Sequence, residues 1–380
     1  MWIKRDIDAF LDKRMFGGKT IVIYGPRQAG KTSAVRNYIQ RAGLANDVAF
    51  FNGDEAADRE TLADASAARI KALVSGKRVL FVDEAQRVPE IGMVLKRIKD
   101  GCGDLQTVAT GSSSVELAEK IEEPMTGRKF EYLLMPLSFA ELANETSPLD
   151  EMRETERRLV FGSYPDVVAH PGDEIDRLQE LGKGYLYKDI LKLDGFRRPE
   201  TLDRLARALA FQIGQEVSFA ELAQTCGTDA KTAAKYVDIL EKAYIVRRLP
   251  SFARNGRNEL KKSRKIYFLD CGIRNYVLGD WRPIAARSPE EAGKLWENHL
   301  VSERFKRRLV REPATRDYFW RTAQQQEVDL VEESASGIKA FELKWNAKKA
   351  GTKVPKTFAA AYPDAEFNVV TPADAAEFLL

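Results

Sequence analysis

Gly25-Pro26-Arg27-Gln28-Ala29-Gly30-Lys31-Thr32 is the stretch that decides the fold of this chain, because it has the complete G-x-x-x-x-G-K-T pattern of a phosphate-binding loop. The apolar, β-branched residues 20–24 predict a strand before it, and residues 33–39, which begin with Ser33, predict a helix after it. Such a loop requires a strand and a helix on its two sides. The alternative is a glycine-rich turn that only joins the two elements. We expect residues 25–33 to bind a nucleoside triphosphate.

The spacing of residues in this loop suits a triphosphate. The two glycines let the backbone curl so that successive N–H groups point at phosphate oxygens, and the following helix adds its positive N-terminal end. Lys31 is expected to reach the β- and γ-phosphates, and the hydroxyl of Thr32 to bind Mg2+. The loop therefore predicts both a nucleotide and a magnesium ion as cofactors.

A second strand favours hydrolysis over binding alone. Residues 77–84 are apolar on both faces of the predicted strand and end in two adjacent acids, Asp83 and Glu84. We expect this strand beside the phosphate-loop strand in a parallel sheet, which would place Asp83 near the Mg2+. Glu84 would then polarise the attacking water as a general base. The alternative is that the two acids only begin a solvated turn.

A third strand, residues 105–110, runs into a Gly-Ser-Ser-Ser segment. In ATPases with a strand inserted between the loop strand and the acid strand, a polar residue at this strand end senses the γ-phosphate. Thr110 or Ser112 is the candidate here. Ordinary turn chemistry explains the same residues equally well, since glycine and serine favour turns.

Several motifs together resemble those of prokaryotic AAA-type ATPases that carry a C-terminal domain of unknown function. The resemblance covers nearly the whole chain. It implies an α/β fold with a P-loop parallel sheet and flanking helices, ATP as the nucleotide, and a homo-oligomer such as a ring. The motifs are Gly-Pro-Arg-Gln-x-Gly-Lys-Thr at 25–32, Phe-Val-Asp-Glu-Ala-Gln at 81–86, Thr-Gly-Ser-Ser-Ser at 110–114, Thr-Gly-Arg at 126–128 before Leu-Ser-Phe-Ala-Glu-Leu at 137–142, and Gly-Ser-Tyr-Pro-Asp at 162–166.

Arg128 has a role that the resemblance alone implies. It would contact the γ-phosphate, either within its own subunit or from a neighbouring one. The alternative is a surface arginine that follows a turn glycine.

Composition narrows the class of protein. The chain has 380 residues and a formal net charge of +3, so it has no bulk basic character. Its three cysteines and two histidines are too few and too scattered for a zinc site or a disulfide framework. No apolar run approaches the roughly 20 residues that cross a bilayer, and the first residues do not read as a signal peptide. We expect a cytoplasmic protein without a membrane partner.

Residues 199–280 have the outline of a winged helix. A short helix over 217–224 capped by Ser218, a turn at Gly227 and a helix from 229 to 242 capped by Thr228 precede two β runs, 244–249 and 265–269. Between Arg247 and Lys265 there are eight basic residues against one acid, which would suit phosphate contacts with DNA. A protein-interaction module or a solvated edge is the alternative. The predicted nucleic-acid contacts are Arg247, Arg248, Arg254, Arg257, Lys261, Lys262 and Arg264.

The last third of the chain contains a D…E-x-K arrangement. Alternation along a predicted hairpin places Glu342 and Lys344 on one face, with Asp329 across the pair. Two such carboxylates can hold Mg2+ at a scissile phosphate while the lysine orients water. Glu297, on a predicted helix, would add a further acid. The resemblance supports a small α/β restriction-endonuclease-like fold, which families often keep after its chemistry is lost.

We therefore predict four segments: an AAA-type ATPase core in 1–142, a helical lid or linker in 143–198, a winged-helix domain in 199–280 and a restriction-endonuclease-like domain in 281–380. Two functions remain open. The first is an ATPase that acts on branched, broken or single-stranded DNA, with or without cleavage. The second is a nucleotide-dependent switch whose C-terminal domains bind protein partners.

Overall fold

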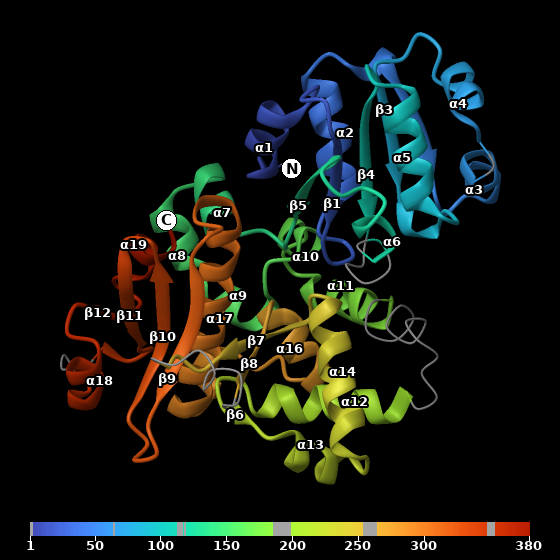
Figure 1. Cartoon of the computed structure of the whole chain (residues 1–380). Helices are drawn as coiled ribbons and strands as arrows, with labels where there is room; N and C mark the ends of the chain where they lie inside the picture. The colour runs from blue at the N-terminus through green and yellow to red at the C-terminus, as the bar shows by residue number, and fades with distance from the viewer. Residues whose placement is uncertain are drawn as a thin grey trace. The chain divides into compact units, whose positions relative to one another are not determined.

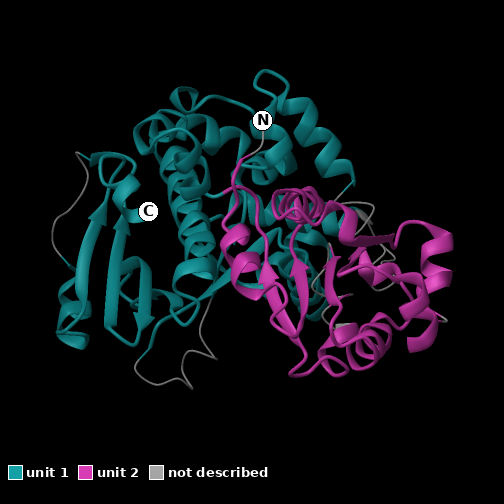
Figure 2. Cartoon of the chain, turned by 90° about the horizontal axis from the view of Figure 1, so that it is seen from above, with its two compact units in different colours: residues 1, 138–380 teal, residues 2–137 magenta. Residues whose placement is uncertain are grey.

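The structure is a computed structural model of the whole chain (Figure 1). It describes residues 3–63, 65–111, 117, 119–184, 199–253, 264–347 and 354–380. The chain divides into two compact units, one running from Trp2 to Leu137 and the other from Ser138 to Leu380 (Figure 2). Among the described residues, none of the helices combines the length and the apolar character that a membrane crossing needs.

The N-terminal unit is built on a five-stranded parallel sheet in the order β2-β3-β4-β1-β5. Its strands are β1 (Thr20–Tyr24), β2 (Val48–Asn52), β3 (Val79–Asp83), β4 (Gln106–Gly111) and β5 (Lys129–Leu133). Its helices are α1 (Ile7–Arg14), α2 (Lys31–Arg41), α3 (Ala56–Ala63), α4 (Ala67–Leu73), α5 (Ile91–Gly101) and α6 (Glu119–Glu122). This is the predicted α/β arrangement of a parallel sheet with flanking helices.

The strand order corrects one expectation. We expected β3 beside β1, but β4 lies between them and pairs with both strands. The carboxyl ends of all three strands still meet at one edge, because the strands are parallel. Asp83 and Thr110 therefore reach the phosphate loop from neighbouring strands.

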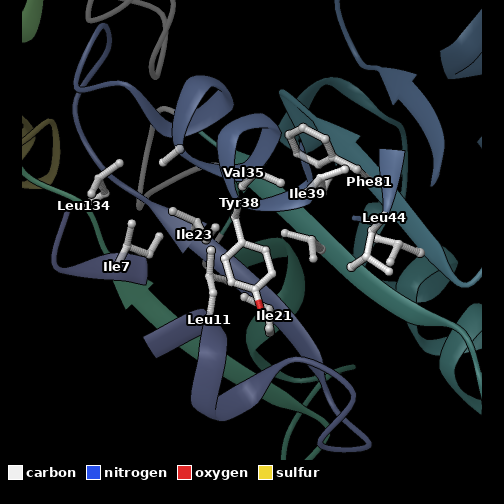
Figure 3. Close-up of a cluster of buried hydrophobic side chains, with 13 residues drawn as sticks. Ile7, Leu11, Ile21, Ile23, Val35, Tyr38, Ile39, Leu44, Phe81 and Leu134 are labelled. Carbon is white, nitrogen blue, oxygen red and sulfur yellow. The ribbon is translucent and has the colours of Figure 1, made fainter. Parts of the chain in front are cut away.

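The core of this unit lies between the sheet and the first two helices (Figure 3). Ile21 and Ile23 point to the same face of β1, because alternate residues of a strand share a face. They pack against α1 and α2, to which Leu11 and Val35 belong. Every residue of β1 and β3 is buried, as expected for the inner strands of a parallel sheet. This packing fixes α2 behind the phosphate loop.

The C-terminal unit begins with helices and a small antiparallel sheet in the order β6-β8-β7. The N-cap of α14 is Asp229, whose side chain accepts a hydrogen bond from the Thr232 N–H, so the predicted cap at Thr228 was wrong. The elements are α7 (Phe139–Glu145), α8 (Pro148–Arg153), α9 (Thr155–Phe161), α10 (Pro165–Ala169), α11 (Glu174–Gly182), α12 (Pro199–Phe211), β6 (Glu216–Val217), α13 (Phe219–Cys226), α14 (Ala230–Lys242), β7 (Val246–Pro250), β8 (Arg264–Phe268) and α16 (Cys271–Leu278).

A second sheet, in the order β12-β11-β10-β9, completes the chain. Strand β10 pairs antiparallel with both β9 and β11, and β12 runs parallel to β11. Phe252, which follows β7, lies in the same core cluster as Tyr318 and Trp320 of β9, so the two sheets share apolar packing. The elements are α17 (Pro289–Arg311), β9 (Arg316–Arg321), β10 (Glu327–Ser334), β11 (Gly337–Leu343), α18 (Lys356–Ala361), β12 (Glu366–Val370) and α19 (Ala375–Leu379).

Candidate functional site

The phosphate loop joins β1 to α2, and its glycines are required by its shape. Gly25 has φ +151°, and a Cβ added there would clash with the Leu134 carbonyl oxygen of the chain beside it. Gly30, the residue before α2, is left-handed with φ +92°. These two positions admit only the smallest residue without strain. Among the other predicted loop residues, Ala29 is buried, Pro26 is buried, Arg27 is half-buried, and Gln28 and Ser33 are exposed.

Lys31 folds back over this loop. Its Nζ donates hydrogen bonds to the carbonyl oxygens of Gly25, at 2.9 Å, and Pro26, at 2.8 Å. Burial lowers the pKa of Lys31 to about 8, although Glu84 and Asp83 favour its charged form. The ammonium group thus lies against the backbone of the loop, and a bound triphosphate would replace the two carbonyl oxygens as its partner.

Asp83 brings the loop and the strand ends together. Its carboxylate accepts hydrogen bonds from the Thr32 hydroxyl, at 2.8 and 3.0 Å, and from the Thr110 hydroxyl. Mg2+ prefers oxygen ligands of this kind, carboxylates and hydroxyls beside phosphate oxygens. The predicted magnesium residues, Thr32 and Asp83, are therefore in contact, and the donor set fits the ion.

Glu84 is oriented by a contact that the sequence analysis missed. It has φ +47°, and its carboxylate accepts a 2.6 Å hydrogen bond from the side-chain amide of Gln86. The backbone carbonyl of Gln86 accepts in turn from Nζ of Lys120 on α6, at 2.8 Å. Gly53 lies so close that a Cβ there would clash with the Glu84 carbonyl oxygen. The only signal in the sequence was the place of Gln86 two residues after Glu84.

Two other predicted nucleotide contacts have different outcomes. Arg128 precedes β5, and its carbonyl oxygen accepts from the Thr20 N–H at the start of β1, so it lies at the amino end of the sheet. The phosphate loop is at the opposite end of the sheet, so the fold does not bring Arg128 to the phosphate loop of its own subunit. Its Nε instead lies 3.3 Å from Asp100. Ser112 lies outside the described residues.

The structure describes three of the seven predicted nucleic-acid contacts. Arg247 packs its side chain over Phe305, with its guanidinium carbon 4.0 Å from the ring centroid, and pairs with Asp317 at 2.7 Å. Arg248 likewise forms ion pairs, with Asp238 at 2.5 Å and with Glu241. Arg264 is half-buried at the start of β8. The remaining four, Arg254, Arg257, Lys261 and Lys262, lie outside the described residues.

The predicted D…E-x-K residues do come together. Nζ of Lys344 lies 2.5 Å from Glu342 and 3.7 Å from Asp329. The Asp329 carboxylate also accepts a 2.8 Å hydrogen bond from the Leu343 N–H. A β-bulge between Val328 and Val331 adds one residue to β10 beside Asp329. Such bulges redirect side chains near functional sites.

Two further acids, Glu297 and Glu327, lie beside Asp329 and Glu342, and we call these four residues the carboxylate cluster. One oxygen each of Glu297, Glu327 and Asp329 lies within 4.8 Å of the others. Sequence alternation could have found Glu327, two residues before Asp329. The sequence analysis missed two contacts of the cluster from β8: Lys265 contacts Glu297 at 3.0 Å and Glu327, while the Tyr267 hydroxyl donates to Glu297 at 2.6 Å. Burial raises the pKa of Glu297, and Lys265 opposes that shift.

A cavity of about 880 Å3 adjoins the carboxylate cluster. Glu297 and Lys344 line it, together with Arg287, Lys294 and Trp345. Trp345 lies against Trp296, with ring centroids 5.3 Å apart. The wall therefore offers cationic and aromatic groups beside the acids.

Three family models match the chain. Residues 17–143 match an AAA domain, residues 152–282 a domain of unknown function (DUF8612), and residues 292–378 a domain of unknown function (DUF4143). Among solved structures, AMPPCP-bound DnaA from Aquifex aeolicus is 12% identical with a TM-score of 0.28, covering 63% of this chain and 87% of that one. Cdc6p from Pyrobaculum aerophilum is 14% identical with a TM-score of 0.30, covering 73% of this chain and 93% of that one.

Curated proteins also align with this chain. An uncharacterized protein of Haemophilus influenzae is 24% identical over 278 residues, 68% of this chain and 69% of that protein. Rv2008c, an uncharacterized protein of Mycobacterium tuberculosis, is 30% identical over 347 residues, 90% of this chain and 74% of that protein. With its AAA domain and this extent of identity, the chain belongs to the family of Rv2008c.

Proposed function

We propose that this protein is a Mg2+-dependent ATPase. One observation carries the proposal: the Thr32 hydroxyl and the Asp83 carboxylate meet at 2.8 Å beside the buried Lys31, at the carboxyl edge of a parallel sheet. A lysine, a hydroxyl and a carboxylate so arranged suit the phosphates and metal of a nucleoside triphosphate. The AAA-domain match over residues 17–143 supports ATP as the nucleotide.

Each part of the nucleotide site has a separate role in the proposed hydrolysis. The N–H groups of the loop bind the phosphates, and Lys31 leaves the carbonyl oxygens of Gly25 and Pro26 to contact them. Thr32 and Asp83 would hold Mg2+, which neutralises charge on the phosphate oxygens when it is bound. Glu84, held by Gln86, accepts a proton from the attacking water.

A homo-oligomer is part of the proposal. Arg128 lies at the amino end of its own sheet, so only a neighbouring subunit could bring it to a γ-phosphate. A ring in which each subunit offers Arg128 to the next would satisfy this requirement. The exposed position of Arg128 supports its use at a subunit boundary.

DNA is the proposed partner of the C-terminal unit. The order α12, β6, α13, α14, β7, β8 and the sheet order β6-β8-β7 support a winged-helix domain. The order α17, β9, β10, β11, α18, β12 and the carboxylate cluster support a restriction-endonuclease-like domain. We propose that ATP turnover drives these domains on branched, broken or single-stranded DNA.

One observation favours a second candidate, an ATP-dependent switch whose C-terminal domains bind protein. Arg247 and Arg248 are neutralised by Asp317, Asp238 and Glu241, which leaves fewer cations for phosphate contacts. A protein partner does not need those charges.

The test measures ATP turnover and nucleic-acid integrity together, with Mg2+, over duplex, single-stranded and branched DNA and over RNA. Turnover that rises several-fold with one form of DNA supports the DNA-coupled ATPase. Slow turnover that ignores every nucleic acid supports the switch. If Lys31→Ala retains normal turnover, the nucleotide site is elsewhere and the proposal fails.

A further inference from the structure

Lys265 is a deeply buried cation beside the carboxylate cluster. Its side chain is 1% exposed, and it reaches from β8 between acids of α17 and β10. Its Nζ lies 3.0 Å from Oε1 of Glu297 and contacts Oε1 of Glu327. These are two of the three acids whose oxygens lie close enough to share a metal ion.

Glu297 has little capacity left for another cation at this oxygen. Oε1 accepts the Lys265 hydrogen bond and a 2.6 Å hydrogen bond from the Tyr267 hydroxyl. A carboxylate oxygen has two lone-pair sites, and both are used. A metal ion that bridges Glu297 and Glu327 through these Oε1 atoms would therefore displace Lys265 or share the two oxygens with it at a distance where like charges repel.

The charges around the cluster also indicate that side chains of the protein occupy the place of a metal ion. Each of its four acids has a cationic partner in contact: Lys265 for Glu297, Lys344 for Asp329 and Glu342, and both Lys265 and Arg321 for Glu327. Buried carboxylates require such compensation, which a divalent ion would otherwise supply. In this structure the protein's own side chains supply it.

We propose that Lys265 is an internal counter-ion that closes the carboxylate cluster to divalent metal. Lys265 and a metal ion then compete for Glu297 and Glu327, and the cluster takes metal only after Lys265 leaves. Because Lys265 and Tyr267 both lie on β8, a displacement of that strand is the event that would open the cluster. The inference rests on the proposed restriction-endonuclease-like fold and not on the ATPase.

The test uses Mn2+ alone as the probe, with the full-length chain and no nucleotide. All proteins carry Asp83→Asn, so that the nucleotide site lacks its carboxylate metal ligand. Mn2+ binding is measured by calorimetry and by the electron paramagnetic resonance of free Mn2+. We expect Lys265→Met to bind Mn2+ at least tenfold more tightly than the protein with Lys265, and Asp329→Asn to remove that gain. Lys294→Met is the matched control, because Lys294 lines the same cavity but pairs with Glu290.

A second variant covers the case in which Lys265→Met does not fold. Lys265→Met with Glu327→Gln removes one charge of each sign and leaves three acids, and it too should gain Mn2+ binding. The proposal is overturned if the protein with Lys265 binds Mn2+ as tightly as either variant through Asp329. It is also overturned if the folded variants bind no more Mn2+ than the Lys294→Met control. ATP turnover of the chain with Asp83 intact is a separate measurement, so failure here leaves the ATPase proposal untouched.

Discussion

The affinity of this protein for ATP should fall as the pH rises, because Lys31 is buried. Burial lowers the pKa of Lys31 to about 8, against 10.5 for an exposed lysine, and the carboxylates of Glu84 and Asp83 oppose only part of that shift. The charged ammonium group attracts a triphosphate, whereas the neutral amine does not. Protein whose Lys31 is neutral must therefore take up a proton when ATP binds.

The magnitude follows from the position of this pKa. With a value of about 8, roughly a tenth of Lys31 is neutral at pH 7 and roughly nine tenths at pH 9. The apparent Kd for ATP should rise about tenfold between these two pH values, or about 1.4 kcal/mol of binding free energy. Below pH 7 the Kd should be nearly independent of this group.

The assay is a titration with a non-hydrolysable ATP analogue and Mg2+ at pH 7, 8 and 9, followed by calorimetry in two buffers of different ionisation enthalpy to count protons taken up. Lys31→Arg is the control, because a guanidinium stays charged over this range. Its affinity should be lower and flat with pH. A wild-type Kd that is equal at pH 7 and pH 9, or a parallel fall in Lys31→Arg, would refute the assignment of the effect to Lys31.

Three further predictions concern single residues. Glu84→Gln should lower kcat for ATP by about 10²- to 10⁴-fold with little change in ATP affinity. Phosphate release measures the first quantity and nucleotide titration the second. Near-normal turnover would show that Glu84 is not the base. Gly162→Ala should cost at least about 2 kcal/mol of stability in thermal unfolding, because φ is +71° and a Cβ would clash with the Asp270 carboxylate; Gly293→Ala, in an open helical position, should not. His299 is buried and its pKa is lowered from 6.5 to about 4, so the unfolded chain binds its proton first and stability is lost as the pH falls from 6.5 to 4. The loss should be roughly 3 kcal/mol and should vanish in His299→Gln; identical acid unfolding of both proteins would contradict it.

The nucleotide site could be predicted from the sequence because its parts are local. The loop, its strand and its helix are consecutive, and Asp83 and Thr110 each end a strand. Parallel strands bring such ends together without any knowledge of side-chain contacts. The order of the strands could not be predicted in the same way, since it depends on which segments pair across the sheet. The motif alone did not show at which edge of the sheet Arg128 lies, and the direction of β5 places it at the amino edge.

The partners of the basic residues could not be predicted, for a different reason. A count of charges in sequence does not show which charges have partners. Arg247 pairs with Asp317 from β9, and Lys265 with Glu297 from α17, and neither acid is near in the sequence. The β-bulge beside Asp329 is equally invisible to strict alternation. Burial and long-range pairing, which arise only in the folded chain, decided these cases.

The contact between Lys265 and Glu297 constrains how this sequence can change over generations. Loss of the lysine alone removes the cationic partner of Glu297 and one of the two cationic partners of Glu327, and loss of the glutamate alone leaves a buried ammonium group with one partner fewer. Breaking a buried ion pair from one side costs about 3–5 kcal/mol, enough to remove most of the stability of many domains. Lys265 and Glu297 are 32 positions apart in the sequence, so a single mutation seldom changes both residues. Lineages should therefore keep the pair together or lose it through an intermediate in which another cation has already taken the place of Lys265.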